Sequence, residues 1–147
     1  MLKRFACALA FALAASAAAS GEWSTWPGSN SNYVAVGIAQ DGAGLILICD
    51  TNRMLLSIGI EEPHAHWQKG APVDVLTTPD GTTPLPPSHG IVIGPTRVIV
   101  ENDAAWRTMG QARKAVAVTV GDYSRIFRVA NLRTAVEPVL RACGDHW

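Results

Sequence analysis

The sequence predicts an α+β or mainly β fold, an antiparallel sheet or small sandwich of about seven to nine short strands with a short helix and a C-terminal helix docked by a disulfide. Short runs of β-branched residues recur between turn-forming Gly, Pro, Asn and Asp, a pattern typical of antiparallel strands. One amphipathic segment lies at the end of the chain, and an even pair of cysteines remains once an N-terminal leader is set aside.

Residues 1–19 have the composition of a secretory signal peptide. Lys3-Arg4 precede the apolar stretch Phe5–Ala15, and Ala17 and Ala19 are the small residues that a signal peptidase requires. An uncleaved anchor is the alternative, but a membrane span needs about 20 apolar residues and this run is shorter. The sequence therefore predicts cleavage after Ala19, a periplasmic or secreted location, and no membrane span after cleavage.

Removal of the leader changes both the charge and the cysteine count. The chain of 147 residues has 12 basic and 12 acidic side chains, and loss of Lys3 and Arg4 leaves it slightly acidic. Without clustered Lys and Arg it lacks the electrostatic footprint of a nucleic-acid-binding protein. Cys7 is removed, and the remaining pair, Cys49 and Cys143, predicts a disulfide in an oxidising compartment. A catalytic cysteine is the alternative, and it would require one of these thiols to be free.

The mature chain is expected to form one domain, residues 33–147, after an irregular lead-in, residues 20–32, whose Trp23 and Trp26 fold back onto it. The continuous apolar run Leu45–Ile48 predicts a central strand covered on both faces. The expected strands, in order, are Tyr33–Ala39, Leu45–Cys49, Met54–Ile60, Pro72–Thr77, Ile91–Ile93, Arg97–Val100, Ala115–Val120 and Arg125–Val129.

Two helices are expected in addition to the strands. Asn102-Asp103 can cap a short helix over Ala104–Arg113. The last helix begins with Asn131 as its cap. Because Cys49 ends the most hydrophobic strand, its bridge to a cysteine of this helix would attach the helix to the sheet. The residues on the helix's apolar face are Leu132, Val136, Val139, Leu140 and Cys143.

The segment Phe127–Gly144 combines a phenylalanine-bearing strand, a helix with an Ala and Leu face, and a cysteine near the terminus. It resembles the tail of two families of exported bacterial proteins, the periplasmic accessory family of type VI secretion and the invasion-associated locus B family. Leu47–Asn52 is similar to the strand and turn that carry the partner cysteine in the first family, and Arg97–Val120 matches in the order strand, helix, strand. Asn131 stands where these families have glycine. The resemblance implies an exported, non-catalytic protein and supplies no catalytic residue.

The segment Pro63–Trp67 contains a candidate metal site. In an extended segment, His64 and His66 point the same way, so their imidazoles could share a Cu or Zn ion. A solvated loop is the alternative. A metal site would need at least one further ligand, and the candidates are His89, His146, Glu61 and Glu62.

The sequence contains no motif typical of hydrolases or of nucleotide-binding proteins. No serine lies in a G-x-S-x-G elbow, and Ser88-His89 are sequential neighbours that need not face each other. Glu61 and Glu62 are adjacent, so in a strand their carboxylates point to opposite faces and cannot flank one glycosidic bond. Gly42-Ala43-Gly44 lacks the later glycine and the helix of a phosphate-binding loop. We therefore expect no enzyme activity and no cofactor.

Tryptophan is abundant in this chain and suggests how it could bind a partner. Large amphipathic rings are enriched at binding hot spots. Of the five, about three are expected in the core, and Trp67 and Trp147 are expected to be exposed and to contact a protein or glycan. The sequence thus predicts a secreted binding or accessory protein that acts through its surface on an envelope, secretion or host partner. The alternative is a metal-binding protein that uses His64 and His66.

Overall fold

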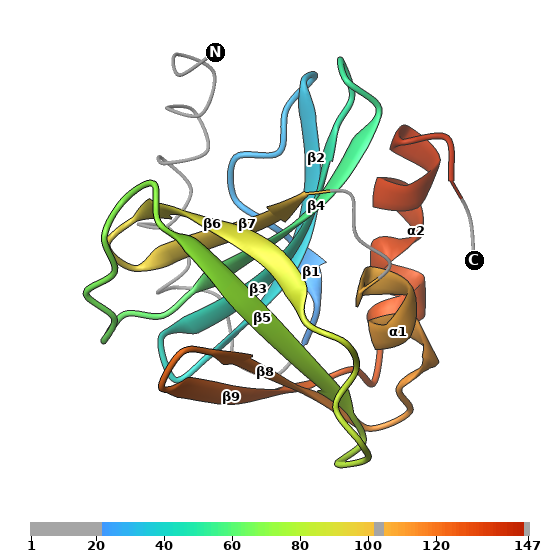
Figure 1. The fold of residues 1–147 in the computed structure, drawn as a ribbon. Helices are drawn as coiled ribbons and strands as arrows, with labels where there is room; N and C mark the ends of the chain where they lie inside the picture. The colour runs from blue at the N-terminus through green and yellow to red at the C-terminus, as the bar shows by residue number, and fades with distance from the viewer. Residues whose placement is uncertain (1–21, 102–104, 146–147) are drawn as a thin grey trace.

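The computed structural model describes residues 22–101 and 105–145, in which nine strands and two helices are found (Figure 1). The predicted signal peptide lies outside the described residues. Within them, no helix is both long and apolar enough to cross a membrane. The elements are β1 (Ser24–Thr25), β2 (Tyr33–Gln40), β3 (Ala43–Asp50), β4 (Leu55–Glu61), β5 (Pro72–Pro79), β6 (Ser88–Gly94), β7 (Arg97–Glu101), α1 (Ala105–Gln111), β8 (Ala115–Val120), β9 (Tyr123–Arg128) and α2 (Leu132–Ala142).

The strands form one antiparallel sheet in the order β1-β2-β3-β4-β7-β6-β5-β8-β9, and both helices lie on the same side of it in Figure 1. The predicted fold class is therefore confirmed, and each expected strand is present within a few residues of its expected limits. The lead-in contributes more than was expected, because it contains β1, which pairs with Val36 and Gly37 of β2.

The sheet curls until its two ends come close together. The indole Nε1 of Trp23, just before β1, donates a 2.6 Å hydrogen bond to the carbonyl of Arg128 at the end of β9. The side chain of Asn131 accepts from the Trp23 amide and donates to the Trp23 carbonyl, both at 3.0 Å. Asn131 is the N-cap residue of α2, as expected, but its side chain makes no capping hydrogen bond, because its amide group joins the two ends of the sheet.

Helix α2 packs on β2 and β3 and covers the inner face of the curled sheet. Its predicted apolar stripe is buried, and the disulfide between Cys49 of β3 and Cys143 is present, with the two Cα atoms 5.7 Å apart. The strand that carries Cys49 also supplies Leu45 and Leu47 to this core. The predicted attachment of the terminal helix to the sheet is therefore confirmed.

Strand β3 differs from its prediction in one respect. Leu45, Leu47 and Cys49 are buried on the inner face, whereas Ile46 and Ile48, which point the opposite way, are only partly buried. No helix of the described chain covers this outer face. The expectation of a strand covered on both faces is therefore wrong, and the continuous apolar run in the sequence has a second cause, which is an apolar outer surface.

The first helix is shorter than expected. It covers Ala105–Gln111, and its Trp106 and Met109 are buried. The expected cap, Asn102-Asp103, lies outside the described residues. Arg107 of α1 bonds Asp145, just beyond α2, with nitrogen and oxygen 2.8 Å apart. This ion pair links α1 to the chain end that follows α2.

We expect the disulfide to supply a large part of the stability of the fold. Cys49 and Cys143 are 94 positions apart, so replacing both with alanine should lower the free energy of unfolding by about 4–5 kcal/mol on the chain-entropy model. Urea unfolding of the oxidised protein and of the double variant measures this difference. A difference below about 1 kcal/mol would contradict the assigned role of the bridge.

Candidate functional site

An apolar groove lies on the outer face of the sheet, over β2, β3, β4, β6 and β7. The space between its lining side chains is shallow and open, about 540 Å³ when the adjoining solvent is included. We call it the isoleucine groove. Its lining residues are Trp26, Tyr33, Ala35, Ile46, Ile48, Gly59, Ile60, Glu61, Ile93, Arg97, Val98 and Ile99.

The cross-strand register explains the shape of the isoleucine groove. Gly59 in β4 lies directly between Ile46 of β3 and Ile99 of β7, and all three face outward. Ile91 of β6 continues the same row beyond Ile99 and is 55% exposed. Because glycine has no side chain, Gly59 forms a low floor between two isoleucine ridges.

Trp26 forms one wall of the isoleucine groove, and its ring packs directly against two glycines of the sheet. A Cβ atom on Gly37 would lie 2.5 Å from Cε3 of Trp26, and one on Gly44 would lie 3.3 Å from its Cη2. Glycine is therefore required at Gly37 for the indole to lie against the sheet. The ring is 4% exposed, and its Nε1 has no hydrogen-bond partner among the described residues.

Ion pairs flank the isoleucine groove on β4 and β7. Glu61 accepts a 2.7 Å hydrogen bond from Arg97 Nε and a 2.8 Å bond from the hydroxyl of Thr96. On the other side of Ile99 in β7, Arg53 and Glu101 are 3.3 Å apart and more exposed. Within each pair the two opposite charges cancel. The apolar floor of the groove therefore lies between two borders that carry no net charge.

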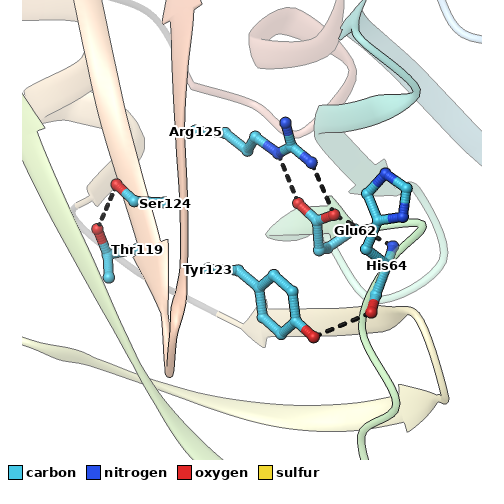
Figure 2. A network of polar contacts seen from close by, with 6 residues as sticks. All are labelled: Glu62, His64, Thr119, Tyr123, Ser124 and Arg125. Carbon is cyan, nitrogen blue, oxygen red and sulfur yellow. Dashed lines mark hydrogen bonds and ion pairs between the residues drawn. The ribbon is translucent and has the colours of Figure 1, made fainter.

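Figure 2 shows that the backbone of His64, one of the two histidines of the predicted metal motif, belongs to a network of polar contacts around Glu62. Glu62 is 2% exposed and accepts two hydrogen bonds from Arg125 of β9, at 2.7 and 2.9 Å. The amide of His64 donates to the same carboxylate, and the hydroxyl of Tyr123 donates to the His64 carbonyl. Hydrogen bonds from Arg125 lower the pKa of Glu62 below its ordinary value of 4.5. The segment after β4 is thus fixed to β9.

Three of the four residues proposed as further metal ligands are paired with other side chains. Glu61 and Glu62 are held by arginines, and Nδ1 of His89 lies 3.0 Å from Asp74 Oδ1. His146 lies outside the described residues. His64 and His66 are both exposed, and in residues 22–101 and 105–145 no group of three or more His, Cys, Asp or Glu side chains could hold a metal ion.

The tryptophans are distributed nearly as expected. Trp23, Trp26 and Trp106 are buried, which confirms three core positions. Trp67 is only partly exposed, because its ring packs against the core and meets Tyr123 in a T-shaped contact with centroids 5.7 Å apart. The expectation of an exposed Trp67 is therefore wrong, and the predicted partner site at Trp147 lies outside the described residues.

The isoleucine groove is the site that motif analysis did not identify. Its residues are ordinary strand formers, and no spacing of polar residues marks them. Two signals were present in the sequence: the unbroken apolar run that includes Ile46 and Ile48, and Gly59 inside a strand of isoleucines. Neither signal could assign the hollow to one face without the register of β3, β4 and β7.

We expect the Glu62 carboxylate to stabilise the fold in a pH-dependent way. Because the folded state has the lower pKa, this stabilisation is fully present above pH 4.5 and is lost as the pH falls through the folded value. Glu62→Gln should therefore lower the free energy of unfolding by about 1–3 kcal/mol at pH 7, and the deficit should shrink on acidification. Urea titrations from pH 7 to pH 3 measure it. Glu137→Gln, which removes an exposed pair with Arg141, should change stability by at most about 0.5 kcal/mol.

We also expect two of the outer-face glycines, Gly37 and Gly59, to respond differently to alanine. Gly37→Ala should destabilise by about 1–3 kcal/mol, because the new methyl group overlaps the Trp26 ring. Gly59→Ala should leave stability the same or higher, because its nearest neighbour, Ile48 Cδ1, would be 3.5 Å away. Thermal or urea unfolding compares the stabilities of the two variants. Equal effects would contradict the close packing of Trp26 on Gly37.

Comparison with known proteins found no match to a family model, to a curated protein or to a solved structure. The resemblance of the C-terminal segment to two exported families therefore stays a prediction.

Proposed function

We propose that the protein is an exported, non-catalytic binding protein that engages an apolar part of an envelope or secretion partner through the isoleucine groove. The observation that carries this proposal is the apolar hollow on the outer face of the central strands. A sheet usually exposes polar residues on the face that lies away from its core. Here the partly buried side chains of Ile46, Ile48, Ile93 and Ile99 take those positions, and apolar surface gathered on one face of a protein marks binding sites.

The covalent chemistry of the fold supports an exported protein. The Cys49–Cys143 bridge belongs to an oxidising compartment, in agreement with the secretory composition of residues 1–19. The same bridge fixes β3, which provides one ridge of the groove. In this proposal, strand β3 carries both the disulfide that indicates export and one ridge of the groove.

A metal-binding role for His64 and His66 has no comparable support. Both imidazoles belong to the loop after β4, whose backbone is held by Glu62 and Tyr123. Fixing this loop to β9 is a structural function that accounts for the motif's position without a metal. It is therefore not part of the proposed function.

The proposal predicts partner contact at one face of the sheet only. A photoreactive amino acid at Ile99, in the isoleucine groove, should give a specific crosslinked adduct in intact cells that secrete the protein. The same amino acid at Ala117, a partly buried position of β8, serves as the control and should give none. Gly59→Val, which fills the groove floor, should lower the yield at Ile99 at least fivefold. Equal adducts from both positions, or a yield indifferent to Gly59→Val, would argue against the groove as the contact site.

A further inference from the structure

We propose that the loop between β5 and β6 presents a short polyproline II helix to an aromatic-lined groove of a partner protein. The segment is Thr-Pro-Leu-Pro-Pro, residues 83–87, and we call it the proline ridge. None of its residues lines the isoleucine groove, so this inference goes beyond the proposed function and concerns a second surface. It follows from the backbone restrictions of the segment, from the directions of its side chains and from the contacts that hold its base.

Proline restricts the backbone of the whole proline ridge. Pro84, Pro86 and Pro87 have φ fixed at about −65°. Thr83 and Leu85 each precede a proline, whose ring disfavours the α-helical region for them and leaves extended conformations. The described chain contains no cis peptide bond, and the ridge belongs to no strand or helix. The extended conformation open to such a segment is polyproline II, which has three residues per turn.

The burial of the side chains has the same period of three. Leu85 is partly buried, and its amide donates a 3.0 Å hydrogen bond to the carbonyl of Thr77 in β5. Ser88, three residues further along, is 8% exposed. One edge of the polyproline II helix therefore lies against the sheet. The other two edges are exposed, and they carry the pairs Thr83 with Pro86 and Pro84 with Pro87.

Contacts at the base hold the proline ridge in place before any partner binds. The carboxylate of Asp80, in the preceding turn, accepts hydrogen bonds of 2.8 to 3.1 Å from three consecutive amides between α1 and β8, those of Arg113, Lys114 and Ala115. The Asp80 amide donates to the Ala115 carbonyl at 2.8 Å. In Figure 1 this loop extends past the end of β5 at the bottom of the view. A segment that is already ordered loses little conformational entropy on binding.

The exposed chemistry of the proline ridge determines the kind of partner. Residues 81–88 contain no charged side chain, so pyrrolidine rings dominate the two exposed edges. Aromatic-lined grooves recognise such edges, because aromatic rings pack on the prolines and their N–H or O–H groups can donate to backbone carbonyls, which form no hydrogen bonds within polyproline II. Arg113 and Lys114, whose amides Asp80 holds at the base, are both exposed. Acidic side chains at the rim of the partner's groove would complement them.

The test is photocrosslinking of the purified secreted protein, with a photoreactive amino acid in place of Thr83, to a detergent extract of the envelope of the cells that secrete it. We expect one specific adduct. An excess of decaproline, which is itself a polyproline II helix, should lower its yield at least fivefold, whereas a flexible Gly-Ser peptide of ten residues should not. Added salt should also lower the yield, because it screens Arg113 and Lys114.

Two proline variants separate recognition from rigidity of the loop. Replacing Pro84 and Pro87 together with alanine removes both rings of one exposed edge and should lower the yield at least fivefold. Pro72→Ala, at an exposed proline of β5 outside the ridge, should crosslink like the wild type. Circular dichroism and the unfolding midpoint show whether each variant is folded, and competition by decaproline on the wild type decides the matter if the double variant is not.

Three results would overturn the inference. They are the absence of an adduct at Thr83, an adduct that decaproline does not displace, and a folded double variant that crosslinks as well as the wild type. In the last case the prolines serve only to stiffen the loop. Crosslinking at Ile99 should not respond to decaproline or to the double variant, so failure of this inference is distinguishable from failure of the isoleucine groove as a contact site.

Discussion

The two faces of β3 are the constraint on which the rest of the structure depends. Side chains alternate along a strand, so burial of Leu45, Leu47 and Cys49 toward α2 places Ile46 and Ile48 on the outer surface. A slip of one residue would reverse every side chain of the strand. It would also turn Cys49 away from its disulfide partner. The bridge therefore fixes the register that forms the core and, on the opposite face, a ridge of the isoleucine groove.

The ends of the curled sheet are joined by polar contacts that also position the groove. Trp23 bonds the end of β9, and Trp26, three residues later, lies on the outer face over the glycines of β2 and β3. The two tryptophans flank the short β1, with Trp23 in the core on the inner face of the sheet and Trp26 on its outer face. Closing the sheet with Trp23 thus brings Trp26 to the wall of the groove, while Glu62 and Arg125 hold the segment after β4.

Strands, turns, the terminal helix and the disulfide could be predicted because each has a local cause in the sequence. Alternation and turn residues mark the strands, and the helix carries a stripe that ends at Cys143. The uses of Asn131, Glu62 and Trp67 could not be predicted in this way. Their partners are Trp23, Arg125 and Tyr123, which lie more than fifty positions away along the chain. Only the curling of the sheet brings these residues together, and local sequence patterns do not predict that curling.

The three outer-face glycines of this sheet differ in what a side chain at each position would meet. Gly37 and Gly44 are glycines because Trp26 occupies the space that a side chain would need. Gly59 is also buried, but a Cβ atom there would meet only the side chains of Ile46 and Ile48, at ordinary contact distances of 3.5 to 3.6 Å. A sheet selected for stability alone would gain from a larger residue there, through burial of apolar area and lower chain entropy in the unfolded state. Packing against Trp26 therefore explains glycine at positions 37 and 44, whereas at position 59 alanine would fit beside Ile46 and Ile48.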